Sequence, residues 1–311
     1  MYKNILISGS LAYDRIMDFP GYFKDHILPD KIHALNVSFL INELKENFGG
    51  TAGNIAYNLA LLGESPYILA SGGADFGNYE KWLRKNKIKI REIRKIRERL
   101  TASAYIITDK ADNQIAGFNP GAMNESRGKF DGKLLKNSIA IISPGNLRDM
   151  EDYAKIYKNK IPYIFDPGQQ ITVLSKEKLK NGITGAEILI GNDYEIEMIK
   201  KKTGWTTDDI IDKVNILIIT KGEQGLEIFA KKEKYLIKAA KPKKVLDPTG
   251  AGDAYRAGLI KGLKEGWPIE QAAQMGSVVA SFAVEKYGGQ NHEFTWREME
   301  KRFRKNFGKN L

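Results

Sequence analysis

A short run, Asp247-Pro-Thr-Gly-Ala-Gly-Asp253, contains residues whose types and spacing could carry out chemistry. Its two glycines leave the backbone free to turn and to present bare amides. The small residues that follow predict a tightly packed helix, and a helix N-terminus attracts anions because its first N–H groups are unpaired. We therefore predict phosphoryl transfer to a hydroxyl, with Asp253 as general base and the amides of Gly250, Ala251 and Gly252 as an anion hole.

The same run could also be an ordinary turn followed by a helix cap, because an isolated glycine motif is weak evidence of function. Its surroundings favour the phosphate site. The strand-like segment Lys244-Val245-Leu246 precedes it and a helical segment follows it. A glycine-rich turn between a strand and a helix is the arrangement in which backbone amides bind phosphate.

Short apolar runs recur along the chain, and each is followed by a turn residue. They are residues 5–7, 67–69, 139–142, 163–165, 188–190 and 216–219. Continuous runs of this length are typical of parallel strands buried on both faces. Helical patterns separate several of them, at 54–62, 79–87, 149–158 and 271–285. The chain is therefore predicted to be an α/β protein with three layers and a doubly wound, mostly parallel sheet.

Five polar residues stand just after strand-like runs: Asp14, Asp166, Asn192, Thr220 and Asp253. In an open parallel sheet, ligands bind beyond the carboxyl ends of the strands. We therefore expect these side chains to converge on one site at that edge.

Two segments, 13–48 and 100–120, interrupt the alternation of strands and helices. Residues 35–41 are rich in β-formers, and residues 105–108 and 115–118 flank a turn and predict a hairpin. We expect a small β-sheet that covers the acceptor site as a lid and excludes water. Residues 1–12, 49–99 and 121–311 would form the core. A small sheet has open edges, so pairing of two lids in a homodimer is also expected.

Composition limits the remaining functional classes. The 311 residues carry 49 Lys and Arg against 38 Asp and Glu, a net charge of +11. This charge is dispersed and accompanies no zinc-finger, helix-turn-helix or RNP-like pattern, so we expect no nucleic-acid partner. There is no cysteine, which excludes disulfides and thiolate sites. No apolar run approaches about 18 residues, and the chain opens directly into a strand pattern, so we expect a cytoplasmic protein with no membrane partner.

The run 247–259 resembles the signature of the ribokinase-like (PfkB) family of carbohydrate and nucleoside kinases. Residues 49–54, Gly-Gly-Thr-Ala-Gly-Asn, resemble the N-terminal glycine signature of that family. Asn192-Asp-Tyr-Glu195 resembles its N-x-x-E motif, and residues 220–225 resemble its nucleotide-binding segment. The resemblance implies a ribokinase-like fold, ATP as phosphoryl donor and Mg²⁺ as its metal.

The resemblance also implies roles for residues in these motifs. Asn192 and Glu195 would organise Mg²⁺ and the ATP phosphates, chiefly through water, because Mg²⁺ keeps several of its waters. Asp247 would help to form a monovalent-cation site, with K⁺ as activator. The ATP segment would comprise Thr220, Lys221, Gly222 and Gly225, and Lys221 could equally be a solvent-exposed lysine.

The acceptor site is predicted from four residues: Ser10, Asp14, Gly50 and Asn54. Asp14 would accept hydrogen bonds from the vicinal hydroxyls of a ribose. Asn54 would supply both a donor and an acceptor, and Gly50 would let the sugar approach the backbone. A turn residue after a strand is the alternative role for Asp14.

Several further segments resemble bacterial-type adenosine kinases: 9–14, 18–21, 26–30, 36–39, 118–123 and 166–170. By that resemblance Phe118 would stack on the nucleobase, and Gln169 and Gln170 would line its pocket. Relatives of this type can carry a second aromatic near the position of Ala104. Strand alternation places Ala104 and its neighbour Tyr105 on opposite faces, which leaves room for bases other than adenine.

These features together predict an ATP- and Mg²⁺-dependent kinase that phosphorylates the 5′-hydroxyl of a nucleoside, with adenosine as the preferred acceptor. Three alternatives stay open at this point. The protein could be a broad nucleoside kinase, a sugar kinase acting on ribose or a hexose, or a nucleotide-binding protein without catalysis. The sequence does not choose among phosphate donors.

Overall fold

The computed structural model describes residues 2–230 and 233–308. Its largest element is an eight-stranded sheet with the order β14-β13-β12-β11-β10-β9-β1-β4. Pairing is parallel from β4 to β12, whereas β13 and β14 are antiparallel additions at one edge. The strands are β1 (Asn4–Ser8), β4 (Tyr67–Leu69), β9 (Ser138–Ile142), β10 (Tyr163–Phe165), β11 (Ile188–Asn192), β12 (Ile216–Thr220), β13 (Leu226–Ala230) and β14 (Glu233–Ile237).

Helices cover both faces of this sheet, because successive residues of each central strand point to opposite sides. Ile5 and Ile7 of β1 join one buried cluster with side chains of α1 (Thr51–Leu61), α2 (Gly77–Lys85), α7 (Ala251–Lys264) and α8 (Ile269–Ala283). Leu6 joins a second cluster on the other face. That cluster includes residues of α3 (Leu147–Tyr157), α4 (Lys176–Ile183), α5 (Asp193–Thr203) and α6 (Thr207–Ile211). The arrangement is the predicted three-layer α/β sandwich.

The C-terminal helix α9 (Trp296–Phe307) adds a third buried cluster on the outer side of α8. Short 3₁₀ helices lie in the connections: η1 (Phe23–Asp25), η2 (Pro29–Ala34), η3 (Gly121–Asn124), η4 (Gly132–Leu135), η5 (Gly168–Thr172) and η6 (Gly222–Gln224). Strands β5 (Ser71–Gly72) and β6 (Arg94–Lys95) form a separate short pair. In the described ranges, no helix is long and apolar enough to cross a membrane.

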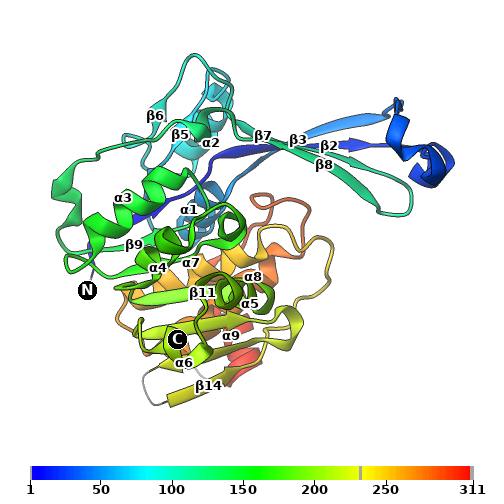
Figure 1. Cartoon of the computed structure of the whole chain (residues 1–311). Coiled ribbons are helices and arrows are strands. Elements are labelled where there is room, and N and C mark those ends of the chain that lie inside the picture. Colours follow the sequence, from blue (N-terminus) through cyan, green and yellow to red (C-terminus); the bar gives the residue numbers. More distant parts are fainter. Residues whose placement is uncertain (1, 231–232, 309–311) are drawn as a thin grey trace.

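A separate four-stranded sheet, which we term the arm sheet, has the order β3-β2-β7-β8. It comprises β2 (Ala12–Asp18), β3 (Glu43–Gly49), β7 (Ala102–Thr108) and β8 (Gln114–Asn119). Figure 1 shows it projecting from the α/β body, with the loop between β2 and β3 at its far end. Strand β8 is exposed along its whole length. The expected small sheet is therefore present, and so is the hairpin predicted around residues 105–118.

The prediction of β-structure at residues 35–41 was wrong. The second strand from this region is β3, and residues 35–41 run as irregular chain before it. Phe39 packs instead on Phe19, Phe23 and His26, with ring centroids 4.8–5.9 Å apart. Phe39 therefore belongs to a local aromatic cluster beyond the end of the arm sheet, whereas Leu35 and Leu40 are exposed. Strand β3 escaped prediction because it is mostly exposed and polar.

Candidate active site

A cavity of about 1420 Å³ opens where the carboxyl ends of the central strands meet the arm sheet. Residues that follow β1, β9 and β10 line it together with the ends of β11 and β12, as expected for an open parallel sheet. All five polar residues that were expected to converge on one site line this cavity. They are Asp14, Asp166, Asn192, Thr220 and Asp253.

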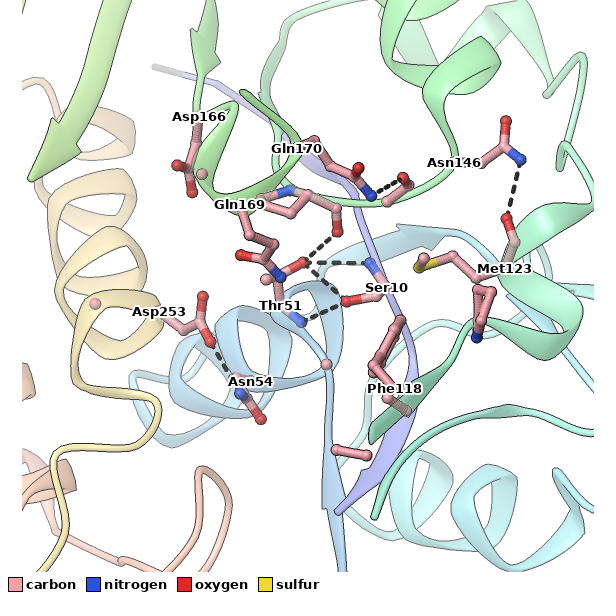
Figure 2. Close-up of a pocket in the computed structure, with 18 of the residues that line it drawn as sticks. Ser10, Thr51, Asn54, Phe118, Met123, Asn146, Asp166, Gln169, Gln170 and Asp253 are labelled. Carbon is pink, nitrogen blue, oxygen red and sulfur yellow. Dashed lines mark hydrogen bonds between the residues drawn. The ribbon is translucent and has the colours of Figure 1, made fainter. Parts of the chain in front are cut away.

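Asp253 lies in the first turn of α7 and faces α1. Its Oδ2 accepts a hydrogen bond of 2.9 Å from Asn54 Nδ2, and Figure 2 shows this contact. Burial raises the pKa of Asp253 from 3.8 to about 7, although the nearby charge of Arg256 and the hydrogen bond from Asn54 both lower it. A carboxylate with a pKa near 7 is well matched to remove and release a proton under neutral conditions.

The backbone before Asp253 forms the turn that the glycines predict. Gly250 is the N-cap of α7 and has a left-handed conformation with φ +77°, which suits glycine. Ala251 departs from the prediction, because its amide donates to Pro248 O at 3.1 Å and closes this turn. The amides of Gly250, Gly252 and Asp253 make no backbone hydrogen bond among the described residues. Of the three amides predicted to bind an anion, those of Gly250 and Gly252 are therefore without a backbone partner in the described part of the chain, and so is that of Asp253.

Asn54 is oriented by a buried polar chain that the sequence did not reveal. Gln290 donates through Nε2 to Asn54 Oδ1 at 3.1 Å and to the Tyr79 hydroxyl, and it accepts from Trp82 Nε1 at 2.9 Å. Because its oxygen is engaged by Gln290, Asn54 presents its NH₂ group to Asp253. Gln290 lies 236 positions from Asn54, so no local pattern could have linked them.

We expect Gln290→Leu to weaken both folding and catalysis. The change leaves buried polar groups of Asn54 and Trp82 unpaired, at about 1–3 kcal/mol each in the free energy of unfolding. It also frees the Asn54 amide to rotate away from Asp253, whose pKa is lowered by the Asn54 hydrogen bond. The acid limb of the pH–rate profile, in which the rate rises as the Asp253 carboxyl loses its proton, should therefore move to higher pH. Trp82→Phe is the matched control: it removes a donor to Gln290 but leaves the Gln290–Asn54 contact. An unmoved acid limb in Gln290→Leu would contradict this role.

The residues predicted to bind the acceptor line the cavity between β2 and α1. Asp14 projects from β2, and burial raises its pKa from 3.8 to about 6, with the charge of Asp247 as the second cause. Gly50 has φ +84°, and a Cβ there would meet Ser10 O at 2.6 Å, so only glycine fits. Ser10 Oγ accepts from Thr51 N at 3.0 Å, so it caps the start of α1 as well as lining the cavity.

The other end of the cavity is less polar. Ala104 of β7 and Phe118 of β8 are register partners on adjacent strands, so they lie side by side on one face of the arm sheet, and both line the wall with Met123. Figure 2 shows Phe118 and Asp253 on opposite sides of Ser10 and Thr51. The Tyr105 hydroxyl accepts from Arg15 Nη1 at 2.9 Å and is absent from the lining. Ala104 and Tyr105 therefore point to opposite faces, as alternation predicts.

Two glutamines complete this end of the cavity. Gln170 donates through Nε2 to Gly145 O at 2.9 Å, which leaves its amide oxygen as an acceptor. Gln169 is exposed and also lines the wall. Figure 2 shows both beside Ser10 and Thr51. The residues predicted to form the base pocket thus line one cavity, and Ala104 lies beside Phe118 on the same face of the arm sheet.

The predicted nucleotide residues divide into two groups. Asn192, Glu195, Thr220 and Gly222 line the cavity. Lys221 pairs instead with Glu227 at 2.7 Å, and Gly225 packs against the backbone of Ile237. These two residues shape the loop after β12 and do not reach the wall.

Asn192 and Glu195 form a reciprocal capping box at the start of α5. Asn192 Oδ1 accepts from Glu195 N at 2.7 Å, and Glu195 Oε2 accepts from Asn192 N at 2.8 Å. Burial raises the pKa of Glu195. Its second oxygen, Oε1, accepts no hydrogen bond in the described parts of the chain. A free carboxylate oxygen beside a large cavity suits Mg²⁺ that keeps most of its water ligands.

Asp247 stands in the turn before α7 and is not among the residues that line the cavity. Its two oxygens accept from Thr249 N and Gly288 N, each at 2.8 Å. The side chain thus ties the turn before α7 to the segment after α8. A carboxylate that bridges two loops can also supply oxygen to a cation.

Sequence reasoning gave no role to Arg256, which also lines the cavity. It forms a two-pronged ion pair with Asp166, at 2.5 Å from Nε to Oδ2 and 2.9 Å from Nη2 to Oδ1. The available signal was its position, about one helical turn after Asp253 in a segment rich in alanine and glycine.

Residues 12–296 match the family model for pfkB family carbohydrate kinases. The chain belongs to this family. It is 34% identical to a nucleoside kinase of Methanocaldococcus jannaschii over 89% of this chain and 92% of that protein. The crystal structure of the M. jannaschii nucleoside kinase, an archaeal member of the ribokinase family, matches with a TM-score of 0.88 and covers 98% of this chain and 99% of that chain.

A nucleoside kinase of Burkholderia thailandensis in complex with ADP-inosine matches with a TM-score of 0.86 and 37% identity, over 98% of this chain and 97% of that chain. The prediction of a ribokinase-like member of the pfkB family is therefore confirmed, and with it the predicted fold. The chain is a phosphotransferase of this kinase family.

Proposed function

We propose that this pfkB-family kinase transfers the γ-phosphoryl group of ATP to the 5′-hydroxyl of a nucleoside. One observation carries the proposal: the same cavity has Asp253 beside free helix amides at one end and Phe118 with Gln170 at the other. A free sugar would use the first end and leave the second empty. The nucleoside kinases with which the chain aligns over most of its length support the same substrate class.

In the proposed reaction the 5′-oxygen of the nucleoside attacks the γ-phosphorus of ATP. The hydroxyl proton passes to Asp253, and the bond between the γ-phosphorus and the β–γ bridging oxygen breaks. ADP leaves, the nucleoside 5′-monophosphate is formed, and Asp253 releases its proton to solvent. The amides of Gly250, Gly252 and Asp253 hold the phosphoryl oxygens, where fixed donors stabilise developing charge.

Base recognition is proposed to be broad, with adenosine among the accepted nucleosides. Ala104, beside Phe118 on the same face of the arm sheet, supplies no second aromatic ring to the base. The Gln170 oxygen can accept from an exocyclic amine or from a ring N–H. Such a pocket discriminates weakly between bases. Adenosine as the preferred acceptor stays a prediction.

Metal ions complete the proposed site. Asn192 and Glu195 would hold Mg²⁺ largely through water, and Mg²⁺ bound with ATP supplies charge neutralisation at the phosphates. Asp247 would supply an oxygen to K⁺ between the two loops that it joins. A bound K⁺ would then help to fix the conformation of the turn whose amides form the proposed anion hole.

The arm sheet is proposed to serve as the lid, formed by residues 13–48 and 100–120. The face of the arm sheet that is turned away from the cavity bears an apolar row. The strand registers place its members side by side: Leu44, Met17, Ile107 and Ile115. Leu44 is 62% exposed. We propose that two arm sheets pair through this face in a homodimer, since an exposed apolar patch favours association.

We expect light scattering to give the mass of two chains for the wild type and of one chain for Leu44→Glu. The introduced carboxylate would have to be buried unpaired in the apolar row, which opposes association. Lys45→Glu, at the adjacent position of β3 and on the opposite face, is the matched control and should remain dimeric. A single-chain mass for the wild type would refute the dimer.

The function is tested by ATP consumption with Mg²⁺ and K⁺, using adenosine, guanosine, inosine, cytidine, ribose and fructose as acceptors. Turnover of several nucleosides, with none of the free sugars, is the expected result. Turnover of adenosine alone would show a selective pocket despite Ala104. Turnover confined to free sugars would refute a nucleoside acceptor, and absence of turnover with every acceptor would refute catalysis on this panel.

A further inference from the structure

Arg256 stands among three carboxylates at the phosphate end of the cavity. Its side chain is 9% exposed, and the electrostatic neighbours of its guanidinium include Asp166, Asp253 and Glu195. Asp166 is the direct partner, at the end of β10. A buried ion pair adds little net stability compared with apolar side chains of the same volume. Stability alone therefore does not explain an arginine at this place.

The guanidinium has donors left over. Of its five N–H groups, two donate to Asp166 and one donates from Nη1 to Gly252 O at 2.9 Å. The two remaining N–H groups, one each on Nη1 and Nη2, have no hydrogen-bond partner within residues 2–230 and 233–308. Arg256 lines the cavity, so these groups can reach a bound anion.

The position of the guanidinium is fixed against the anion hole itself. A Cβ atom on Gly252 would lie only 2.9 Å from Arg256 Nη1, so the cation packs directly on the backbone that carries the free amides. Two other cations line the described cavity wall, Arg148 and Lys178. They come from α3 and α4, which are capped by Asn146 and Ser175, and not from α7, the helix that carries Asp253. Arg256 is therefore the cation placed next to Asp253 in sequence and in space.

We propose that Arg256 is a catalytic residue whose two free N–H groups bind the γ-phosphoryl oxygens during transfer, and that Asp166 is the positioning residue that orients it. This inference rests on the proposed function. A planar guanidinium suits a phosphoryl group because it donates two parallel hydrogen bonds. The cation also offsets the repulsion between the Asp253 carboxylate and the approaching phosphoryl group. Asp166 keeps the cation in place before ATP binds.

The test compares Arg256→Ala with the double variant Arg256→Ala/Asp166→Asn. The single variant leaves Asp166 buried without a partner, so it loses stability as well as activity. The double variant removes that unpaired charge and should recover stability, measured by urea unfolding. We expect kcat to stay about 100-fold below the wild type in both variants, as for loss of one oxyanion donor. The nucleoside KM should not change.

Two further readouts separate direct binding from a structural role. Added guanidinium should raise kcat of Arg256→Ala in proportion to its concentration. Added guanidinium should not raise kcat of the double variant, because that variant lacks the Asp166 carboxylate that would bind the ion. A free guanidinium ion cannot join α7 to β10, so rescue reports on the charge alone. In calorimetry, the Kd of a non-hydrolysable ATP analogue should rise about tenfold in the double variant, with the Kd of ADP unchanged.

Each result decides the proposal. Recovery of kcat in the double variant would overturn it, because the defect would then come from the unpaired Asp166. Equal losses of affinity for ADP and the ATP analogue would also overturn it. Failure of the proposed function is a separate result: the wild type would then turn over no nucleoside, whereas the difference between ADP and the ATP analogue would still decide whether Arg256 binds the γ-phosphoryl group.

Discussion

The variant Asp253→Asn is expected to lower kcat by about three orders of magnitude, the middle of the range for general-base catalysis. The asparagine has the same shape and can still accept the hydrogen bond that Asn54 Nδ2 donates to Asp253 Oδ2. It cannot take the proton of the 5′-hydroxyl. The KM values for nucleoside and ATP should change little, because neither the arm sheet nor the anion-hole amides are altered.

The pH dependence gives the same variant a second test. The pKa of Asp253 is raised to about 7, chiefly by burial, and the carboxylate form is the base. Wild-type kcat should therefore rise with pH up to about 7 and then level off. This limb should be absent in Asp253→Asn. Asp193→Asn, a change of an exposed carboxylate in the first turn of α5, is the matched control and should keep both the rate and the limb.

The effect on stability has the opposite sign. The raised pKa of Asp253 means that the folded state binds this proton more tightly than the unfolded state does. Its stabilising contribution is present below pH 3.8 and is lost as pH rises to about 7. Above pH 7, Asp253→Asn should therefore unfold at a higher urea concentration than the wild type. A variant that is both inactive and less stable would point to misfolding instead of loss of the base.

The site could be predicted largely because its residues belong to local patterns. Asp166, Asn192 and Thr220 each follow a continuous apolar run, and parallel strands bring their carboxyl ends to one edge. The opposite orientation of Ala104 and Tyr105 followed from alternation alone. These relations need only the period of a strand and the direction of the chain.

The remainder depends on contacts that no local pattern encodes. Gln290 reaches Asn54 across 236 positions, and the Asp166–Arg256 pair joins residues 90 positions apart. Ala251 lost its expected role because its amide closes a turn on Pro248, a detail of backbone geometry. Residues 35–41 have β-forming character but form irregular chain, with Phe39 packed in an aromatic cluster beyond the end of the arm sheet.

The second large effect is expected from Asp14→Ala, which should raise the nucleoside KM by about 100-fold with little change in kcat. Hydrogen bonds to a charged group are worth about 1.5–3 kcal/mol each, and the two vicinal hydroxyls of a ribose would donate two of them. The KM for ATP should not change. Asp18→Ala, at the exposed end of the same strand, is the control and should behave as the wild type.

A 2′-deoxynucleoside makes this prediction specific to the Asp14 carboxylate. For the wild type, loss of the 2′-hydroxyl should raise KM, because one hydrogen bond to Asp14 is lost. In Asp14→Ala, the ribonucleoside and the 2′-deoxynucleoside should have equal KM values. The pKa of Asp14 is raised to about 6 by burial and by the charge of Asp247, so wild-type KM should also rise as pH falls below 6. If the variant still distinguished the two nucleosides, another group would bind the 2′-hydroxyl, and Asp14 would be a residue of β2 without a role in binding.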